Sequence, residues 1–137
     1  MSITRRQFTG LSIATAATAF LSVAPSFAAS SQRTGQLSGR QGYEVSGTIV
    51  VEKDGDTTKV ILKSDYLFDP SKNPPDIKIA FGDGEKYAKG SEIHDELTVK
   101  KGEASFDVPA GIDTDQYSEI YIYCEKFTVI LAAATLN

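Results

Sequence analysis

The single cysteine of the chain, Cys124, is the residue whose type most directly suggests chemistry. It lies within the densest β-forming run of the sequence, residues 117–137. Ile120, Ile122 and Cys124 share one parity in this run, so a strand would turn the thiol toward the same face as the two isoleucines. Such a thiol either packs as a small hydrophobe or, in a partly exposed and electropositive setting, reacts as a thiolate. The residues alone leave both roles open.

An irregularity follows the cysteine. After Lys126 the apolar parity slips by one residue, to Phe127 and Val129. A bulge or a tight connection must therefore separate two strand segments. Cys124 would be the last inward residue before this irregularity, and we expect its thiol to be accessible to solvent there.

Tyrosines give a second candidate set. Tyr121 and Tyr123 alternate with the inward residues and so project opposite to Cys124, and Tyr43 adds a further ring. These rings could pack against a second sheet, form a surface for a partner, or flank a planar cofactor. Core packing is the default role of such residues.

Metal-binding candidates are few. One cysteine and one histidine cannot supply the ligands of an ordinary zinc site, and a lone cysteine excludes an intramolecular disulfide. His94 lies in a polar stretch beside Asp95, where we expect a solvated surface residue.

Acidic glycine turns are the remaining candidates for a hard cation such as calcium. Asp54 and Asp56 flank one glycine, and Asp83 and Glu85 flank another. Carboxylates of this kind could bind calcium, but Asp and Gly are also what ordinary hairpin turns require. Neither turn has the full spacing of an EF-hand loop, and we expect no metal site.

The amino terminus has the pattern of an export signal over residues 1–28. Arg5 and Arg6 precede a moderately apolar stretch at 11–23, and small residues favour cleavage after Ala28. The paired arginines followed by Phe8 resemble the twin-arginine motif. The alternative is an ordinary secretory signal that contains two arginines. We expect a periplasmic or otherwise exported protein.

Cleavage would change the charge of the mature chain. It removes two of the 14 basic residues and none of the 18 acidic ones, so the net charge goes from -4 to -6. An acidic surface disfavours nucleic acid and anionic membranes as partners. The apolar stretch is too short for a permanent membrane span, so we expect no integral span after signal removal.

The mature chain divides into a predicted flexible linker at 29–42, rich in Ser, Gly and Gln, and one domain at 43–137. From Tyr43 onward, short alternating runs are separated by Gly, Pro and Asp turns, and no run has a helical period. We expect about seven short strands, at 43–51, 58–62, 76–81, 97–99, 104–108 and two within 117–137. The pattern predicts an all-β, single-domain antiparallel β-sandwich or small barrel.

Three segments together resemble the electron transfer DM-thirteen (DM13) domain family. They are Tyr43-Glu44-Val45-Ser46-Gly47, Pro75-Asp76-Ile77-Lys78-Ile79 and Tyr117-Ser118-Glu119-Ile120-Tyr121-Ile122-Tyr123-Cys124-Glu125-Lys126-Phe127-Thr128-Val129. The resemblance covers residues 43–136, and its most specific part runs from Tyr123 to Val129. Two departures are visible: Tyr123 stands where tryptophan is common, and Tyr43 stands where histidine is common.

The resemblance implies a β-rich extracytoplasmic domain whose terminal-motif cysteine acts in redox chemistry, as a free thiol or by binding a group such as haem. That role transfers to Cys124, with Tyr123 and Tyr43 as candidate cofactor-binding residues. Because Tyr43 replaces the histidine, a cysteine-plus-histidine ligand pair is in doubt here.

The leading functional hypothesis is an exported redox or electron-transfer accessory domain with Cys124 as its active group. Its partner would be an unidentified redox protein or small molecule. The competing hypothesis is a non-enzymatic periplasmic β-sandwich that binds a partner or haem, with a cysteine that only packs.

Replacement of Arg5 and Arg6 by lysine is expected to block export, because the twin-arginine route reads both arginines. Cell fractionation of the variant and the wild type measures this. Arrival of the mature variant in the periplasm at the normal rate would identify ordinary secretion instead.

Overall fold

The computed structural model describes residues 30–137, so the predicted signal at 1–28, with Arg5, Arg6, Phe8 and the cleavage site, lies outside the described residues. Strands and one short 3₁₀ helix make up this part: β1 Ser30–Gln36, β2 Ser38–Gly39, β3 Val45–Ser46, β4 Thr48–Asp54, β5 Thr57–Leu62, β6 Leu67–Phe68, β7 Ile77–Asp83, β8 Lys86–Tyr87, β9 Ala104–Asp107, η2 Thr114–Gln116, β10 Glu119–Cys124 and β11 Val129–Thr135.

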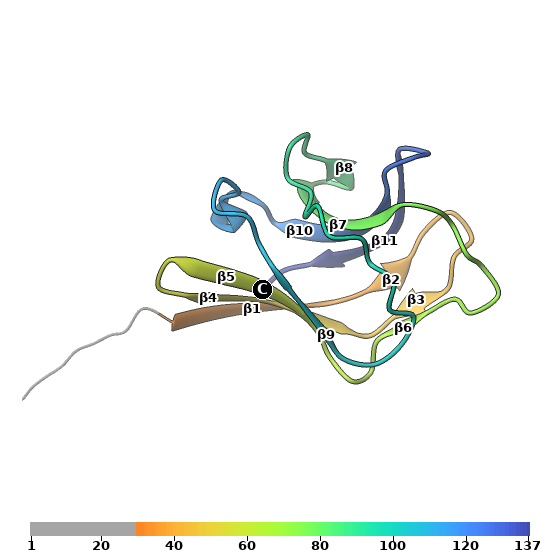
Figure 1. The fold of residues 1–137 in the computed structure, drawn as a ribbon, viewed down its shortest axis with the longest axis horizontal. Helices are drawn as coiled ribbons and strands as arrows, with labels where there is room; N and C mark the ends of the chain where they lie inside the picture. Colours follow the sequence, from red (N-terminus) through yellow and green to blue (C-terminus); the bar gives the residue numbers. More distant parts are fainter. Residues whose placement is uncertain (1–29) are drawn as a thin grey trace, which may run out of the picture.

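Two antiparallel sheets form the two layers of the molecule (Figure 1). One has the order β1-β4-β5-β9, the other has the order β2-β11-β10-β7-β8, and β3 pairs with β6 in a short separate ribbon. Within residues 30–137 neither sheet closes on itself, so the fold is a sandwich and not a barrel. The predicted all-β antiparallel architecture is confirmed.

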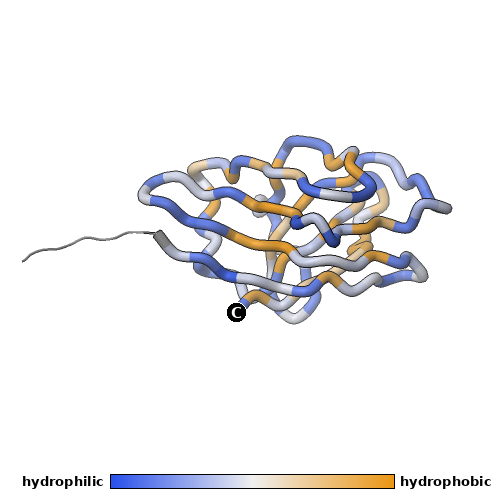
Figure 2. The backbone as a smooth tube through the Cα atoms, turned by 90° about the horizontal axis from the view of Figure 1, so that it is seen from below, coloured by the Kyte–Doolittle hydropathy of each residue, from blue (hydrophilic) through white to orange (hydrophobic). Residues whose placement is uncertain are grey.

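The main core fills the space between the sheets. Period-2 alternation directs one face of each long strand inward, and hydrophobic residues gather along the middle of the strands while the turns are hydrophilic (Figure 2). Buried members of this core on β4, β5, β7 and β10 are Ile49, Val51, Val60, Leu62, Ile77, Ile79, Phe81, Ile120, Ile122 and Cys124.

The stretch 29–42, expected to be a flexible linker, is largely part of the sandwich. All seven residues of β1 pair with β4, and β2 pairs with β11. Leu37, between these strands, is 5 % exposed and belongs to the main core. The composition of this stretch wrongly indicated a linker because β1 is an edge strand, which is held by backbone hydrogen bonds that any residue type can make.

Glycine at position 35 is required by close packing. A Cβ atom there would lie 2.7 Å from the carbonyl oxygen of Thr135, so only glycine lets β1 approach the end of β11. Gly35, one of the glycines that suggested a linker, is therefore needed for a contact between the two sheets.

The predicted strand at 97–99 is absent from the described structure. This segment instead follows the free part of the β7 edge, where the backbone N–H groups of Ile93 and Leu97 donate to Ile79 and Ile77 at 2.7 Å each. The number of strands with four or more residues still equals the expected seven, because β1 takes the place of the missing strand.

Leu37→Ala is expected to lower the free energy of unfolding by about 2–5 kcal/mol, since it leaves a cavity in the main core. Leu67→Ala is the matched control: Leu67 is 43 % exposed, and its loss should cost less than about 1 kcal/mol. Urea denaturation of both variants measures the difference. Equal, small effects would mean that the segment before Tyr43 contributes little to the fold.

Candidate functional site

The hairpin of β10 and β11 positions the candidate cysteine. A turn at residues 125–128 directly follows Cys124. In addition, Ile122 pairs with Ala132 while Tyr123 pairs with Ile130, so Leu131 is an extra, bulged residue. The tight connection and the bulge that the parity change required are thus both present.

Cys124 is completely enclosed. Its backbone pairs with Ile77 of β7 on one side and Val129 of β11 on the other, and its side chain is 0 % exposed. Its Sγ donates a hydrogen bond to the carbonyl oxygen of Pro75 at 3.1 Å. The expectation of a solvent-accessible thiol is wrong, because the segment that leads into β7 covers the end of β10.

An electrostatic clamp holds this covering segment in place. Lys78 Nζ contacts the carboxylates of Asp76 at 2.7 Å and Glu125 at 2.8 Å, and the Glu125 N–H donates to the Asp76 carbonyl at 3.0 Å. The hydrogen bonds to Asp76 and Glu125 raise the pKa of Lys78. The clamp joins Asp76, directly before β7, to Glu125, directly after Cys124, so it ties the ends of these two strands together.

This arrangement fixes the resting chemistry of the sulfur. The hydrogen bond to the Pro75 carbonyl uses the one donor of the Cys124 thiol. A thiolate nucleophile needs an exposed, electropositive setting, which the enclosed Sγ lacks. Reaction at this atom therefore requires the end of the hairpin to open.

The three predicted cofactor-binding residues do not meet. Cys124 belongs to the main core, whereas Tyr123 lies on the other face of the same sheet. Tyr43 packs beside Phe68 with ring centroids 5.9 Å apart, under the Nζ of Lys72. One planar group could not contact Cys124 and Tyr123 from the same side of β10.

Ligation of haem by Cys124 or by His94 in a common site does not fit this conformation. A cysteine ligand must present its thiolate to iron at the face of a large macrocycle, but Cys124 Sγ is enclosed and hydrogen-bonded. His94, the one imidazole, is exposed on the segment between β8 and β9. Neither residue offers an axial ligand to a common site.

The outer cluster occupies the far face of the β7-β10-β11 sheet and consists of Ala80, Tyr121, Tyr123 and Ala133, with Tyr87 and Ile130 packed against it. The rings of Tyr87 and Tyr123 stack with centroids 4.3 Å apart and planes inclined by 17°. Burial raises the pKa of both phenols, so both are neutral at physiological pH. The tyrosine alternation predicted from the sequence is confirmed.

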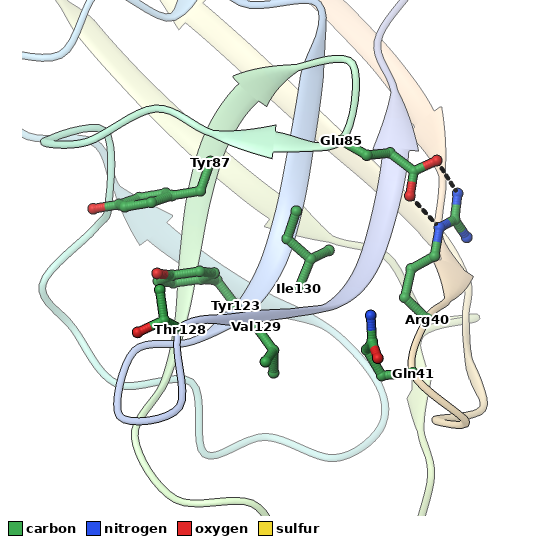
Figure 3. A pocket seen from close by; sticks show the side chains of 8 residues that line it. All are labelled: Arg40, Gln41, Glu85, Tyr87, Tyr123, Thr128, Val129 and Ile130. Atoms are coloured by element: carbon green, nitrogen blue, oxygen red, sulfur yellow. Dashed lines mark hydrogen bonds and ion pairs between the residues drawn. The ribbon is translucent and has the colours of Figure 1, made fainter.

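A pocket of about 440 Å³ opens beside this stack. Figure 3 shows the tyrosine pair on one side, the Arg40–Glu85 ion pair on the other, and Ile130 between them. Its lining residues are Arg40, Gln41, Glu85, Tyr87, Tyr123, Thr128, Val129 and Ile130. They come from the β2–β3 connection, the β7–β8 hairpin, the end of β10 and the start of β11.

Several residues of this pocket were not predicted from the sequence as site residues. Arg40 and Gln41 lay in the predicted linker, and none of the predicted strands included Tyr87. The hairpin signal Asp83-Gly84 before Tyr87 was the available indication that this ring returns onto the sheet.

The acidic turn with Asp83 and Glu85 is occupied by protein donors. Asp83 accepts hydrogen bonds from the Ser118 hydroxyl and N–H at 2.7 and 2.8 Å, which lower its pKa. Glu85 binds Arg40, and the hydrogen bond from Arg40 lowers the pKa of Glu85. Within residues 30–137 no group of three His, Cys, Asp or Glu side chains could hold a metal ion, and no helix is long and apolar enough to cross a membrane.

Alkylation of Cys124 at neutral pH is expected to be about tenfold or more slower in the folded chain than in urea, since an opening free energy of about 1.4 kcal/mol already gives this factor. Lys78→Gln should speed labelling of the folded chain about fivefold by breaking the clamp. Lys59→Gln is the control, because the Lys59–Asp107 ion pair lies on the other sheet. Equal labelling in all three folded proteins would contradict the clamp.

Comparison with known proteins places these features in a family. The family model for electron transfer DM13 matches residues 36–136, from the last residue of β1 to the residue after β11. No curated protein and no solved structure matches the chain. The match confirms the resemblance found in the sequence and supports a redox accessory role. The chain belongs to the electron transfer DM13 family.

Proposed function

We propose that this protein is an exported redox accessory domain and that Cys124 is its redox-active group. The observation that carries the proposal is the family match, which spans both sheets and includes Cys124. The single cysteine is the one side chain of the sequence with ordinary thiol redox chemistry.

The geometry supports a protected thiol that reacts through local opening. Cys124 is the last residue of β10, and beyond it the turn carries Phe127, which is 59 % exposed. Elements with few buried contacts open at a lower free energy than the core. Separation of the Pro75–Asp76 segment from this hairpin end would uncover Sγ without unfolding the two sheets.

Export and partner class form the second part of the proposal. Arg5 and Arg6 support export, and an extracytoplasmic compartment permits thiol oxidation. The partner is a redox protein or small molecule, and the acidic net charge disfavours nucleic acid.

A second candidate is a periplasmic binding module in which Cys124 only packs. The complete burial of Cys124, on a face shared with Ile120 and Ile122, favours this alternative. The two candidates differ in how the thiol becomes reachable: by local opening in the first, and by global unfolding alone in the second.

Hydrogen peroxide is expected to convert Cys124 of the folded chain to a sulfenic acid, with peroxide reduced to water. Mass spectrometry after trapping of the sulfenic acid with dimedone measures this, in urea concentrations below the unfolding transition. A rate independent of urea there identifies local opening.

Cys124→Ser is the matched control, because a serine hydroxyl can still donate to the Pro75 carbonyl but cannot be oxidised in this way. It should fold with little loss of stability and give no trapped product. A wild-type rate that rises with urea in parallel with global unfolding would contradict the redox role and leave the binding module as the function.

A further inference from the structure

Three residues around the pocket adopt an unfavourable backbone conformation. Gln41, Glu85 and Thr128 have φ angles of 58°, 59° and 58°, in the left-handed region that favours glycine. All three line the pocket, and Asp76 is the one other non-glycine residue with positive φ within residues 30–137. Strained residues of this kind concentrate at ligand-binding sites, where the side chain is needed despite its conformational cost.

The pocket has the size of a small-molecule site and a lining of both apolar and polar side chains. Its volume of about 440 Å³ lies within the range of ligand pockets, which are lined mainly by hydrophobic and aromatic groups with a few polar ones. Val129 and Ile130 form the apolar base, and the Tyr87–Tyr123 stack forms a rigid wall (Figure 3).

The two charged side chains of the lining, Arg40 and Glu85, form an ion pair with each other. Arg40 donates to both carboxylate oxygens of Glu85, at 2.6 and 3.3 Å, and its remaining contacts go to Ser38 and Gly39 at 3.1 Å. Arg40 is therefore occupied and does not present a free positive charge to an anion. Both tyrosines are neutral, so the pocket selects for an uncharged molecule.

One polar group is free to orient a ligand. The Gln41 amide has no hydrogen-bond partner among the described residues, and in Figure 3 it lies on the Arg40 side of the pocket. An amide N–H donor beside an apolar base suits a ligand whose carbonyl oxygen lies at the edge of a hydrophobic ring.

We propose that this pocket binds a quinone, an uncharged ring with carbonyl oxygens, which packs on Ile130 beside the tyrosine stack and accepts a hydrogen bond from Gln41. The choice of a redox-active ring rests on the proposed function. Tyr123 lines the pocket and directly precedes Cys124 in β10. The quinone ring would therefore lie on the opposite face of the sheet from the Cys124 thiol.

The test is a titration of the full chain, labelled at isoleucine methyl groups, with duroquinone, which has no free ring position for a thiol to attack. Saturable movement of the Ile130 methyl resonance is expected, with no change at Ile61 of β5 on the other sheet. Durene, the same methylated ring without carbonyl groups, should bind about fivefold more weakly or worse, the factor of one net hydrogen bond.

Gln41→Gly removes the side-chain amide and places a glycine at a backbone position with φ 58°, which glycine adopts without strain. It should weaken duroquinone about fivefold without lowering the Tm. Gln116→Gly is the control, since it removes an exposed amide outside the pocket lining and should leave affinity unchanged.

Absence of saturable Ile130 shifts, equal affinity for durene and duroquinone, or full affinity in Gln41→Gly would each overturn the proposal. Cys124→Ser separates this test from the redox proposal, because it removes the thiol and should keep the duroquinone affinity. Loss of Cys124 oxidation with intact quinone binding would refute the redox role alone, and intact oxidation without binding would refute the site alone.

Discussion

Burial of β10 on both faces and both edges is the constraint on which the other features depend. The strand pairs with β7 on one side and β11 on the other. Its inward residues belong to the main core, and its outward tyrosines are buried as members of the outer cluster. A strand enclosed in this way must be apolar on both faces, which explains the unbroken run of isoleucine and tyrosine before Cys124.

Local patterns made the architecture of this region predictable. Alternation placed Ile120, Ile122 and Cys124 on one face and the tyrosines on the other, and the Asp54-Gly55 signal correctly located the turn between β4 and β5. Such patterns depend on neighbours a few residues away, and these are visible in a single sequence.

Long-range contacts made the site unpredictable. The carbonyl that covers the thiol belongs to Pro75, 49 residues before Cys124 in the chain. The strand β1 has no apolar alternation, and backbone pairing with β4 holds it in the sheet. The pocket is formed by residues from four separate segments. Neither propensity nor spacing encodes which distant backbone group will lie against a given side chain.

The consecutive positions of Tyr123 and Cys124 have a thermodynamic consequence. Both residues depend on the closed hairpin end, one for its aromatic wall and the other for its cover. A molecule that binds the tyrosine face only when the hairpin is closed would make the thiol harder to oxidise. That molecule would lower the population of the open hairpin end, and linkage requires that opening weaken its binding by the same factor. The bound molecule and the Cys124 thiol would thus be coupled through β10 without direct contact.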